Sequence, residues 1–474
     1  MRVVVVGAGF GGLACAVRLA ASGHAVTVLE QGSSPGGKAG RVELAADGHT
    51  WRFDSGPSLL TMPWVVRALF EETGTPLPEL VPVEPVTRYH FADGSTFALS
   101  ADLAASRAAL DAWAPGAGDE WAAFLATCGA MWAASQPFLT GPPPWPPRRP
   151  SPEDAPPDPR DLLRVKPWHT LRSLARAHTR DPRLQMVIER FATYAGADPR
   201  RAPAALAVAG YVEHAFGAWH VAGGVYELVR ALEARFVALG GELRYEVPVS
   251  GIVRGRHRYA GGVRTADGVV AADHVVWNGD ALALARQLDG GRHARRERSL
   301  SGLALMLAVD GRTPGQVHHE IRFPASYHAE MDDLFVRRRP VHEPTLYVST
   351  SSITSPGEAP ADGENWFVLV NAPTGVGADW EAEADRVVAR LGVGDRVRVR
   401  HVRSPADLEA ETGALGGAIY GDAPHGRLGS IGRPGHRVRG LRNVWRVGGT
   451  AHPGGGLPLV MLGGALVARE IGAA

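Results

Sequence analysis

The first thirty residues alternate between apolar runs and a glycine-rich break. Residues 2–6 (RVVVV) are apolar and β-branched with no polar position after the first, the pattern of a strand that is covered on both faces of a parallel sheet. The stretch GAGFGG (7–12) follows, and LACAVRLAASG then has apolar positions at helical spacing up to Gly23. A second strand, AVTVLE (25–30), ends on a carboxylate. This order predicts a β–α–β unit at the start of a parallel sheet.

The same order of strand, glycine loop and helix returns at the other end of the chain. Residues 443–447 (NVWRV) have a strand pattern and lead through GGTAHPGGGLP (448–458). The following residues, LVMLGGALVARE, are apolar at helical spacing. The chain therefore presents two glycine loops, each of which ends at the start of a helix.

The first glycine loop has the residues that a dinucleotide pyrophosphate requires. Gly7 permits the tight turn, Gly9 lets the backbone approach the phosphates, and Gly12 lets helix and strand pack closely. Free N–H groups at the helix N-terminus favour the anion. Glu30, at the end of the second strand, would accept hydrogen bonds from a ribose diol and repel a 2′-phosphate, which favours FAD or NAD over NADP. We predict an α/β, Rossmann-like dinucleotide-binding domain.

Composition and charge narrow the class of protein. The 474 residues are 45% hydrophobic and 21% charged with a formal net charge of +1, which is typical of a globular protein and does not indicate nucleic acid as a partner. The two cysteines are too few for a disulfide framework or a zinc cluster, so we expect a cytoplasmic protein without a metal site. Glycines interrupt the first apolar run, which excludes a signal peptide, and no apolar stretch is long enough to predict a spanning helix.

Two further segments carry a resemblance to a known family. GSSPGGKAGRVEL (32–44) with FDSGPSLLTMP (53–63) resembles the second dinucleotide loop of the flavin amine oxidase and carotenoid desaturase superfamily. The resemblance implies that the cofactor is FAD, bound non-covalently, with Arg41 against its pyrophosphate. Residues 443–458 resemble the closing FAD motif of the phytoene desaturase family, in which the loop passes under the flavin ring. Gly454, Gly455 and Gly456 would let the backbone lie flat against that ring.

The glycine motifs and the resemblance together give the residues expected to hold FAD. Val249 is implied to meet the adenine through its backbone, and Asn278 to end a strand close to the cofactor. The full set is Gly7, Gly9, Phe10, Gly11, Gly12, Glu30, Gln31, Gly37, Lys38, Arg41, Gly56, Pro57, Ser58, Val249, Asn278, Gly448, Gly449, Gly456, Leu457 and Pro458.

The resemblance covers nearly the whole chain and implies a discontinuous FAD-binding domain with an inserted α+β substrate domain. The FAD-binding pieces are residues 1–75, 218–290 and 415–474, and the substrate domain comprises 76–217 and 291–414.

Residues 119–160 depart from a compact fold. Ten prolines fall within the nineteen positions of 141–159, which predicts a stiff, extended excursion. Trp121, Trp132 and Trp145, with Arg148 and Arg149, resemble an interfacial anchor, and a buried segment followed by a disordered loop is the alternative. We expect this segment to dock on a membrane surface, where a polyene lipid substrate would be found.

The implied reaction is desaturation of an acyclic carotenoid, with features of the 3,4-desaturase branch. A hydride would leave a carbon next to the polyene for flavin N5, and a proton would leave the neighbouring carbon. His220 is the candidate proton acceptor and Trp219 a wall for the polyene, while Glu213 and His214 are weaker candidates. Oxygen or a membrane quinone would reoxidise the flavin.

Three alternatives stay open at the level of sequence. A phytoene desaturase would act on another part of a carotenoid, and a polyene isomerase or hydratase would bind the same ligand without net oxidation. A flavin amine oxidase is disfavoured, because such enzymes usually place a lysine near the flavin late in the chain and none follows Lys166 here.

Overall fold

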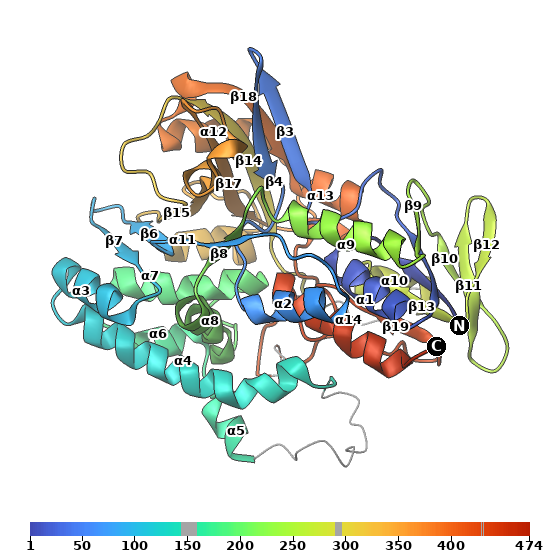
Figure 1. Ribbon diagram of the computed structural model, residues 1–474. Coiled ribbons are helices and arrows are strands. Elements are labelled where there is room, and N and C mark those ends of the chain that lie inside the picture. The colour runs from blue at the N-terminus through green and yellow to red at the C-terminus, as the bar shows by residue number, and fades with distance from the viewer. Residues whose placement is uncertain (144–158, 290–295, 428, 430) are drawn as a thin grey trace.

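The computed structural model describes residues 1–143, 159–289, 296–427, 429 and 431–474. A parallel sheet with flanking helices contains both ends of the chain, and a larger sheet and a group of helices lie beside it (Figure 1). The α/β, Rossmann-like class predicted from the first glycine loop is confirmed.

The parallel sheet has five strands from separate stretches of the chain. In spatial order they are β19 (Val444–Arg446), β13 (His274–Trp277), β1 (Arg2–Val6), β2 (Ala25–Leu29) and β9 (Glu242–Arg244). Val3 and Val5 of β1 pack among the helices, whereas Val4 and Val6 belong to the core on the opposite face. The prediction that this first strand is buried on both faces is thus correct, and it explains why no polar residue interrupts it.

Helices cover one face of this sheet, and a small antiparallel sheet packs on the other. The helices are α1 (Phe10–Ala21), α9 (Tyr226–Ala238) and α14 (Leu457–Ile471), of which α1 contacts both of the others. The small sheet consists of β10 (Gly251–Arg254), β11 (Ala260–Thr265) and β12 (Gly268–Ala271), with α10 (Ala281–Asp289) beside it.

The larger sheet has seven strands, antiparallel except for the pair β15–β6. In spatial order they are β18 (Val397–Arg403), β14 (Ser301–Asp310), β17 (Gly363–Ala372), β16 (Leu346–Ser349), β15 (His319–Arg322), β6 (Thr87–His90) and β7 (Thr96–Leu99). Helix α12 (Trp380–Leu391) packs on one face of it. On the other face lies the hairpin of β3 (Arg41–Ala46) and β4 (His49–Asp54), through Trp51 and Phe53.

The helical group covers the edge of the larger sheet and has its own core. Its members are α3 (Leu103–Trp113), α4 (Ala117–Thr140), α5 (Pro159–Arg164), α6 (Leu171–His178), α7 (Pro182–Arg190), α8 (Val208–Phe216) and α11 (Tyr327–Asp332). The remaining helices and strands are α2 (Pro63–Glu72), β5 (Leu80–Pro82), β8 (Trp219–Val221) and α13 (Pro405–Thr412).

The prediction that Trp121 and Trp132 are exposed is wrong. Their exposed fractions are 2% and 8%, because α4 is covered along its length by neighbouring helices. Trp121 packs on Phe124, and Trp132 packs edge-on against Phe216. The other predicted anchors, Trp145, Arg148 and Arg149, lie outside the described residues.

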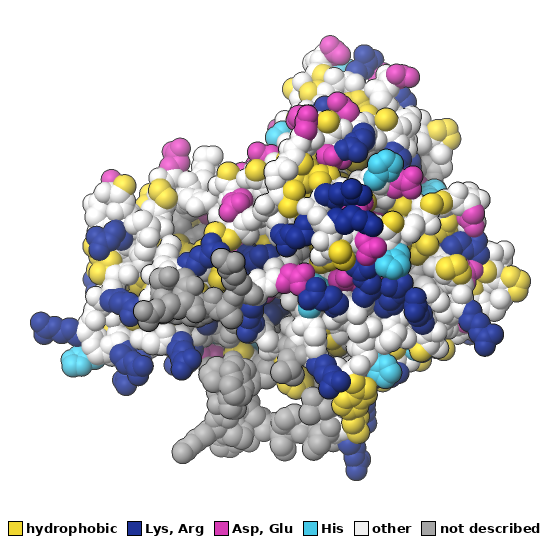
Figure 2. All heavy atoms as spheres, turned by 180° about the vertical axis from the view of Figure 1, so that it is seen from behind, with side chains coloured by type: hydrophobic (Ala, Val, Ile, Leu, Met, Phe, Trp, Pro, Cys, Tyr) yellow, Lys and Arg dark blue, Asp and Glu magenta, His cyan; other side chains and the backbone are white. Residues whose placement is uncertain are grey.

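The surface near α5 has a different character from α4. Leu163 and Trp168 are 59% and 57% exposed. Seen from behind, Lys and Arg side chains gather over the lower half of the molecule, where few acidic side chains are visible (Figure 2). Within the described residues, no helix combines the length and the apolar character needed to cross a membrane.

Candidate functional site

The two glycine loops meet. A methyl group on Gly11, in the first turn of α1, would lie 2.9 Å from Cα of Gly448 in the second loop. Gly448 has a φ of +88°, which L side chains rarely adopt. Helices α1 and α14 then pack side by side, as Figure 1 shows. The loops at the two ends of the chain therefore form one site.

Asn278, the residue after β13, fills the space between the loops. Its Nδ2 donates to the carbonyl oxygen of Gly7 over 3.1 Å. A methyl group on Gly9 or Gly12 would lie 2.9 Å from the same nitrogen, and one on Gly448 would lie 2.6 Å from Oδ1. The side chain of Asn278 thus contacts both loops at once. The sequence predicted only that this residue ends a strand close to the cofactor.

The N-terminus of α1 is suited to an anion. Its N-cap, Gly9, has no side-chain cap, and the first turn has no acidic residue. The first N–H groups of a helix have no partner within the helix, and the helix dipole makes this end positive. Gly12 completes the fit, since a methyl group there would lie 2.3 Å from the carbonyl oxygen of Gly7. The cradle fits the pyrophosphate of a dinucleotide such as FAD.

Glu30 is buried at the end of β2 beside this loop. Its Oε2 accepts from the backbone N–H of Ala8 over 2.6 Å, and its Oε1 accepts from that of Gly32 over 2.8 Å. A carboxylate has about four acceptor positions, so it keeps capacity for a ribose diol. The backbone N–H of Val247 donates to the carbonyl oxygen of Glu30 over 2.8 Å, which brings the segment containing Val249 alongside.

Lys38 and Arg41 make specific contacts within the protein. Nζ of Lys38 donates to the carbonyl oxygens of Ala418 and Ile419 over 3.0 and 2.6 Å, and burial lowers its pKa to about 8. Arg41 donates to Glu227 over 2.5 Å. Lys38 therefore ties the second dinucleotide loop to the segment that precedes the C-terminal glycine loop.

The other residues predicted to bind FAD contact different parts of the protein. The amide of Gln31 donates to the carbonyl oxygen of Glu411. Ser58 Oγ and Tyr347 OH are hydrogen-bonded over 2.7 Å, toward the larger sheet. A methyl group on Gly56 would lie 2.0 Å from the carbonyl oxygen of Lys38, so packing alone requires a glycine at this position. Phe10, Gly37 and Pro57 lie on these same loops, and Gly449, Leu457 and Pro458 on the C-terminal one.

The C-terminal glycine loop leaves its backbone open where α14 begins. Gly456, the N-cap of α14, has a φ of +104°, and no atom lies within 4 Å of where its Cβ would be. Gly455 lies against Tyr420, whose Cδ1 would be 2.5 Å from a methyl group there. Arg433 Nη1 donates to the carbonyl oxygens of Tyr420 and Gly449 over 3.0 and 3.1 Å. Neither Tyr420 nor Arg433 has a sequence signal that would have identified it.

The two predicted catalytic residues point to opposite sides of β8. His220 has no exposed surface, and its Nε2 is 2.9 Å from Oε1 of Glu358. Trp219 is half-buried, and its Nε1 donates to the carbonyl oxygen of Phe216 over 2.8 Å. Adjacent residues of a strand face opposite ways, so the structure does not bring these two side chains together.

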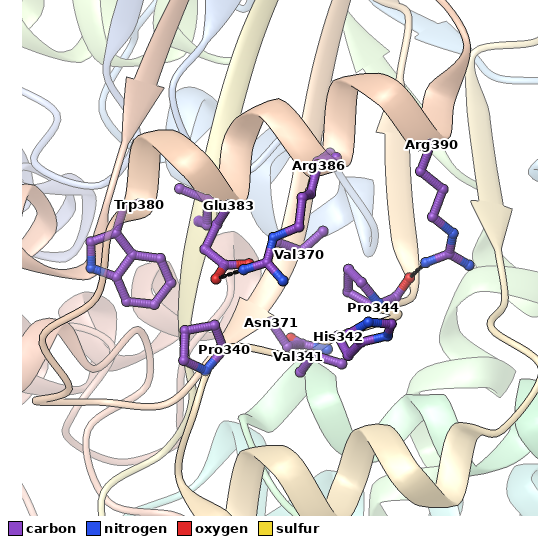
Figure 3. A pocket seen from close by; sticks show the side chains of 12 residues that line it. Pro340, Val341, His342, Pro344, Val370, Asn371, Trp380, Glu383, Arg386 and Arg390 are labelled. Atoms are coloured by element: carbon purple, nitrogen blue, oxygen red, sulfur yellow. Dashed lines mark hydrogen bonds and ion pairs between the residues drawn. The ribbon is translucent and has the colours of Figure 1, made fainter.

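A small pocket lies away from the glycine loops. It has a cavity volume of about 30 Å³, room for no more than a water or two, between α12 and the larger sheet. Arg386 points to Glu383, and Arg390 to the carbonyl oxygen of Pro344 (Figure 3). Its size excludes it as a site for a large organic ligand. Among the described residues, no group of three or more His, Cys, Asp and Glu side chains is arranged to hold a metal ion.

Known proteins resemble the chain over its whole length. Residues 10–303 match the family "Flavin containing amine oxidoreductase". The chain is 35% identical to a hydroxyneurosporene desaturase from Cereibacter sphaeroides, over 99% of this chain and 97% of that protein. It is 32% identical to a 4,4′-diapolycopene oxygenase from a Methylomonas species, over 99% and 98% of the two chains. A solved structure of putrescine oxidase bound to putrescine matches this chain with a TM-score of 0.67 at 15% identity, and the match covers 100% of each chain.

Proposed function

The chain belongs to the flavin containing amine oxidoreductase family and is a flavin-dependent oxidoreductase, and from that premise we propose that it is an FAD-dependent desaturase of an acyclic carotenoid. The observation that carries the proposal is the full-length similarity, at 35% identity, to a hydroxyneurosporene desaturase, together with a single site that both glycine loops form. Relatives named as phytoene and zeta-carotene desaturases match over nearly the full length of this chain as well.

The chain's own residues supply the binding and orientation. The N-terminus of α1, Asn278 and Glu30 are proposed to hold the pyrophosphate and ribose, and the open backbone at Gly456 to lie at the flavin ring. When bound, FAD accepts two electrons as a hydride at N5. The N–H groups at the start of α14 are proposed to favour the negative charge that a reduced flavin carries.

His220 is the proposed proton acceptor. Glu358 at Nε2 favours the tautomer that carries its proton there, and Nδ1 has no hydrogen-bond partner among the described residues. Nδ1 is then the basic atom that accepts the proton from the carbon next to the hydride donor. Trp219, on the opposite face of the strand, is the proposed wall for the polyene.

Anaerobic mixing with an acyclic carotenoid tests the proposed reaction. In a single turnover we expect the oxidised-flavin absorbance to fall while the carotenoid maximum moves to the red, because each electron pair that reaches the flavin leaves one new double bond and lengthens the conjugated chain by at least that bond. A shifted polyene spectrum with an unchanged flavin would indicate an isomerase instead. Bleaching by an amine but not by any carotenoid would indicate an amine oxidase. Subsequent mixing with oxygen or a quinone identifies the acceptor.

A membrane surface is the second part of the proposal. A carotenoid of roughly forty carbons gains about 0.8 kcal/mol for each CH₂ removed from water, so it resides in lipid. Because Trp121 and Trp132 are buried, we propose that the surface around α5, with exposed Leu163 and Trp168, contacts the bilayer.

Replacing Leu163 and Trp168 together with glutamate is expected to reduce flotation with anionic liposomes at least tenfold. Burial of each side chain contributes about 1.5–3 kcal/mol, and the new charges are repelled by the lipid. Val336→Glu is the matched control, because Val336, in the turn Asp333–Arg337 that follows α11, is 68% exposed and does not belong to the α5 segment. Equal flotation of the double variant and the control would show that the bilayer is contacted elsewhere.

A further inference from the structure

Arg433 lies along the C-terminal glycine loop, and the proposed reaction gives it no role. Its Nη1 donates to the carbonyl oxygens of Tyr420 and Gly449 over 3.0 and 3.1 Å. A methyl group on Gly454 would lie 3.5 Å from its Nε. The guanidinium therefore lies beside the loop from Gly449 to Gly454, just before the open backbone at Gly456.

The charge of Arg433 has no counter-ion in direct contact. Among the described residues, no carboxylate oxygen lies within ion-pair distance of its guanidinium. Burial lowers the pKa of Arg433, and the charge of Asp422 raises it, but Asp422 is itself paired with Arg298 over 3.0 Å. A guanidinium stays protonated in proteins, and charges withdrawn from solvent are normally paired. This cation therefore suits an anion that the chain itself does not supply.

The start of α14 adds to the positive character of the loop. Its first turn has no acidic residue and its N-terminus has no side-chain cap, so the helix dipole makes this end positive. Burial lowers the pKa of His452, in the same loop, to about 4, so that this imidazole is neutral at pH 7. The guanidinium of Arg433 and the N-terminus of α14 are thus two independent positive features beside one loop.

We propose that the charge of Arg433 stabilises the reduced form of the flavin relative to the oxidised form; this inference rests on the proposed function. A hydride brings two electrons and one proton to the ring, so the oxidised ring is neutral and the reduced ring carries one negative charge. A fixed positive charge beside the loop lowers the free energy of the reduced form and not that of the neutral one. The midpoint potential of the flavin rises, which favours hydride transfer from a C–H bond.

The test is the midpoint potential of the bound flavin, measured without carotenoid by slow anaerobic reduction in the presence of a reference dye. Arg433→Gln removes the charge and keeps a donor for the carbonyl oxygens of the loop. We expect its potential to fall by at least about 30 mV, which is a tenfold change in the equilibrium constant of a two-electron reduction. Arg433→Lys keeps the charge and should stay within about twofold of the wild type in the same constant.

Arg390→Gln is the matched control. Arg390 also donates to backbone carbonyl oxygens, those of Pro344 and Phe323, and burial lowers its pKa as well. It lines the small pocket between α12 and the larger sheet, away from the glycine loops, so its replacement should leave the potential unchanged. Arg433→Met, which fills the space with apolar atoms, replaces Arg433→Gln in the comparison if the latter does not retain FAD.

The potential separates an electrostatic role from a structural one, because it depends only on the ratio of the affinities for reduced and oxidised FAD. A structural role would weaken both affinities equally and leave the potential unchanged. An unchanged potential in the uncharged variants, or an equal fall in Arg433→Lys or Arg390→Gln, contradicts the inference and leaves the proposed desaturase in place. Loss of FAD from both uncharged variants would show that Arg433 holds the oxidised cofactor as well, and also contradicts it. A wild-type chain that binds no flavin contradicts the proposed function, and the inference with it.

Discussion

Gly448→Ala is expected to yield a folded protein that binds FAD at least about 100-fold more weakly than the wild type. The φ of +88° at this position costs an L residue about 1–2 kcal/mol. The new methyl group would also lie 2.6 Å from Oδ1 of Asn278, a distance that real Cβ contacts do not reach. To relieve the contact, Asn278 must shift, and its bond to Gly7 in the other loop is then lost. One methyl group thus disturbs both cofactor loops.

The measurement is the flavin-to-protein absorbance ratio of the purified protein, followed by titration of the apoprotein with FAD. Gly251→Ala is the matched control, because Gly251 has no positive φ and no atom lies within 4 Å of its Cβ position. Equal FAD affinity in Gly448→Ala and Gly251→Ala would show that the contact between the loops is not needed to hold the cofactor.

The β–α–β unit could be predicted from sequence because all of its determinants are local. Five consecutive residues establish that β1 is buried on both faces, and the glycine spacing of 7–12 establishes the turn. The contact between the two glycine loops has no such local signal. Gly11 and Gly448 are far apart in the chain, and only the packing of α1 on α14 brings them together.

The error over Trp121 and Trp132 has a physical cause. Helix α4 is apolar around most of its circumference, so its sequence does not distinguish a helix enclosed by protein from one that lies in lipid. The aromatic partners that enclose it, Phe216 among them, come from distant segments.

Hydrogen bonds from side chains to backbone atoms far away in the sequence could not be predicted either. Lys38 bonds to the carbonyl oxygens of Ala418 and Ile419, and Arg433 to that of Gly449, and a carbonyl oxygen has no residue-type signature. Glu213 was a weak candidate for proton transfer from sequence.

Asn278→Asp is expected to weaken FAD binding by roughly 100-fold or more with little change in shape. The substitution replaces the Nδ2 donor, which bonds to the carbonyl oxygen of Gly7 over 3.1 Å, with an oxygen that repels it. It also places a negative charge beside the N-terminus of α1, where the pyrophosphate is proposed to bind. Repulsion between two like charges a few ångströms apart amounts to about 3 kcal/mol at an effective dielectric constant of about 20.

Asn278→Ala separates the two effects, since it removes the donor without adding a charge. We expect a loss of about tenfold for it, the value of one hydrogen bond. FAD binding by Asn278→Asp should also recover as the pH falls from 8 to 5, because a protonated carboxyl group is neutral and can donate to Gly7 again. Titration of each apoprotein with FAD at both pH values measures this. If Asn278→Asp binds FAD as tightly as Asn278→Ala at pH 8, the added charge does not repel the pyrophosphate. The N-terminus of α1 is then not the site where the pyrophosphate binds.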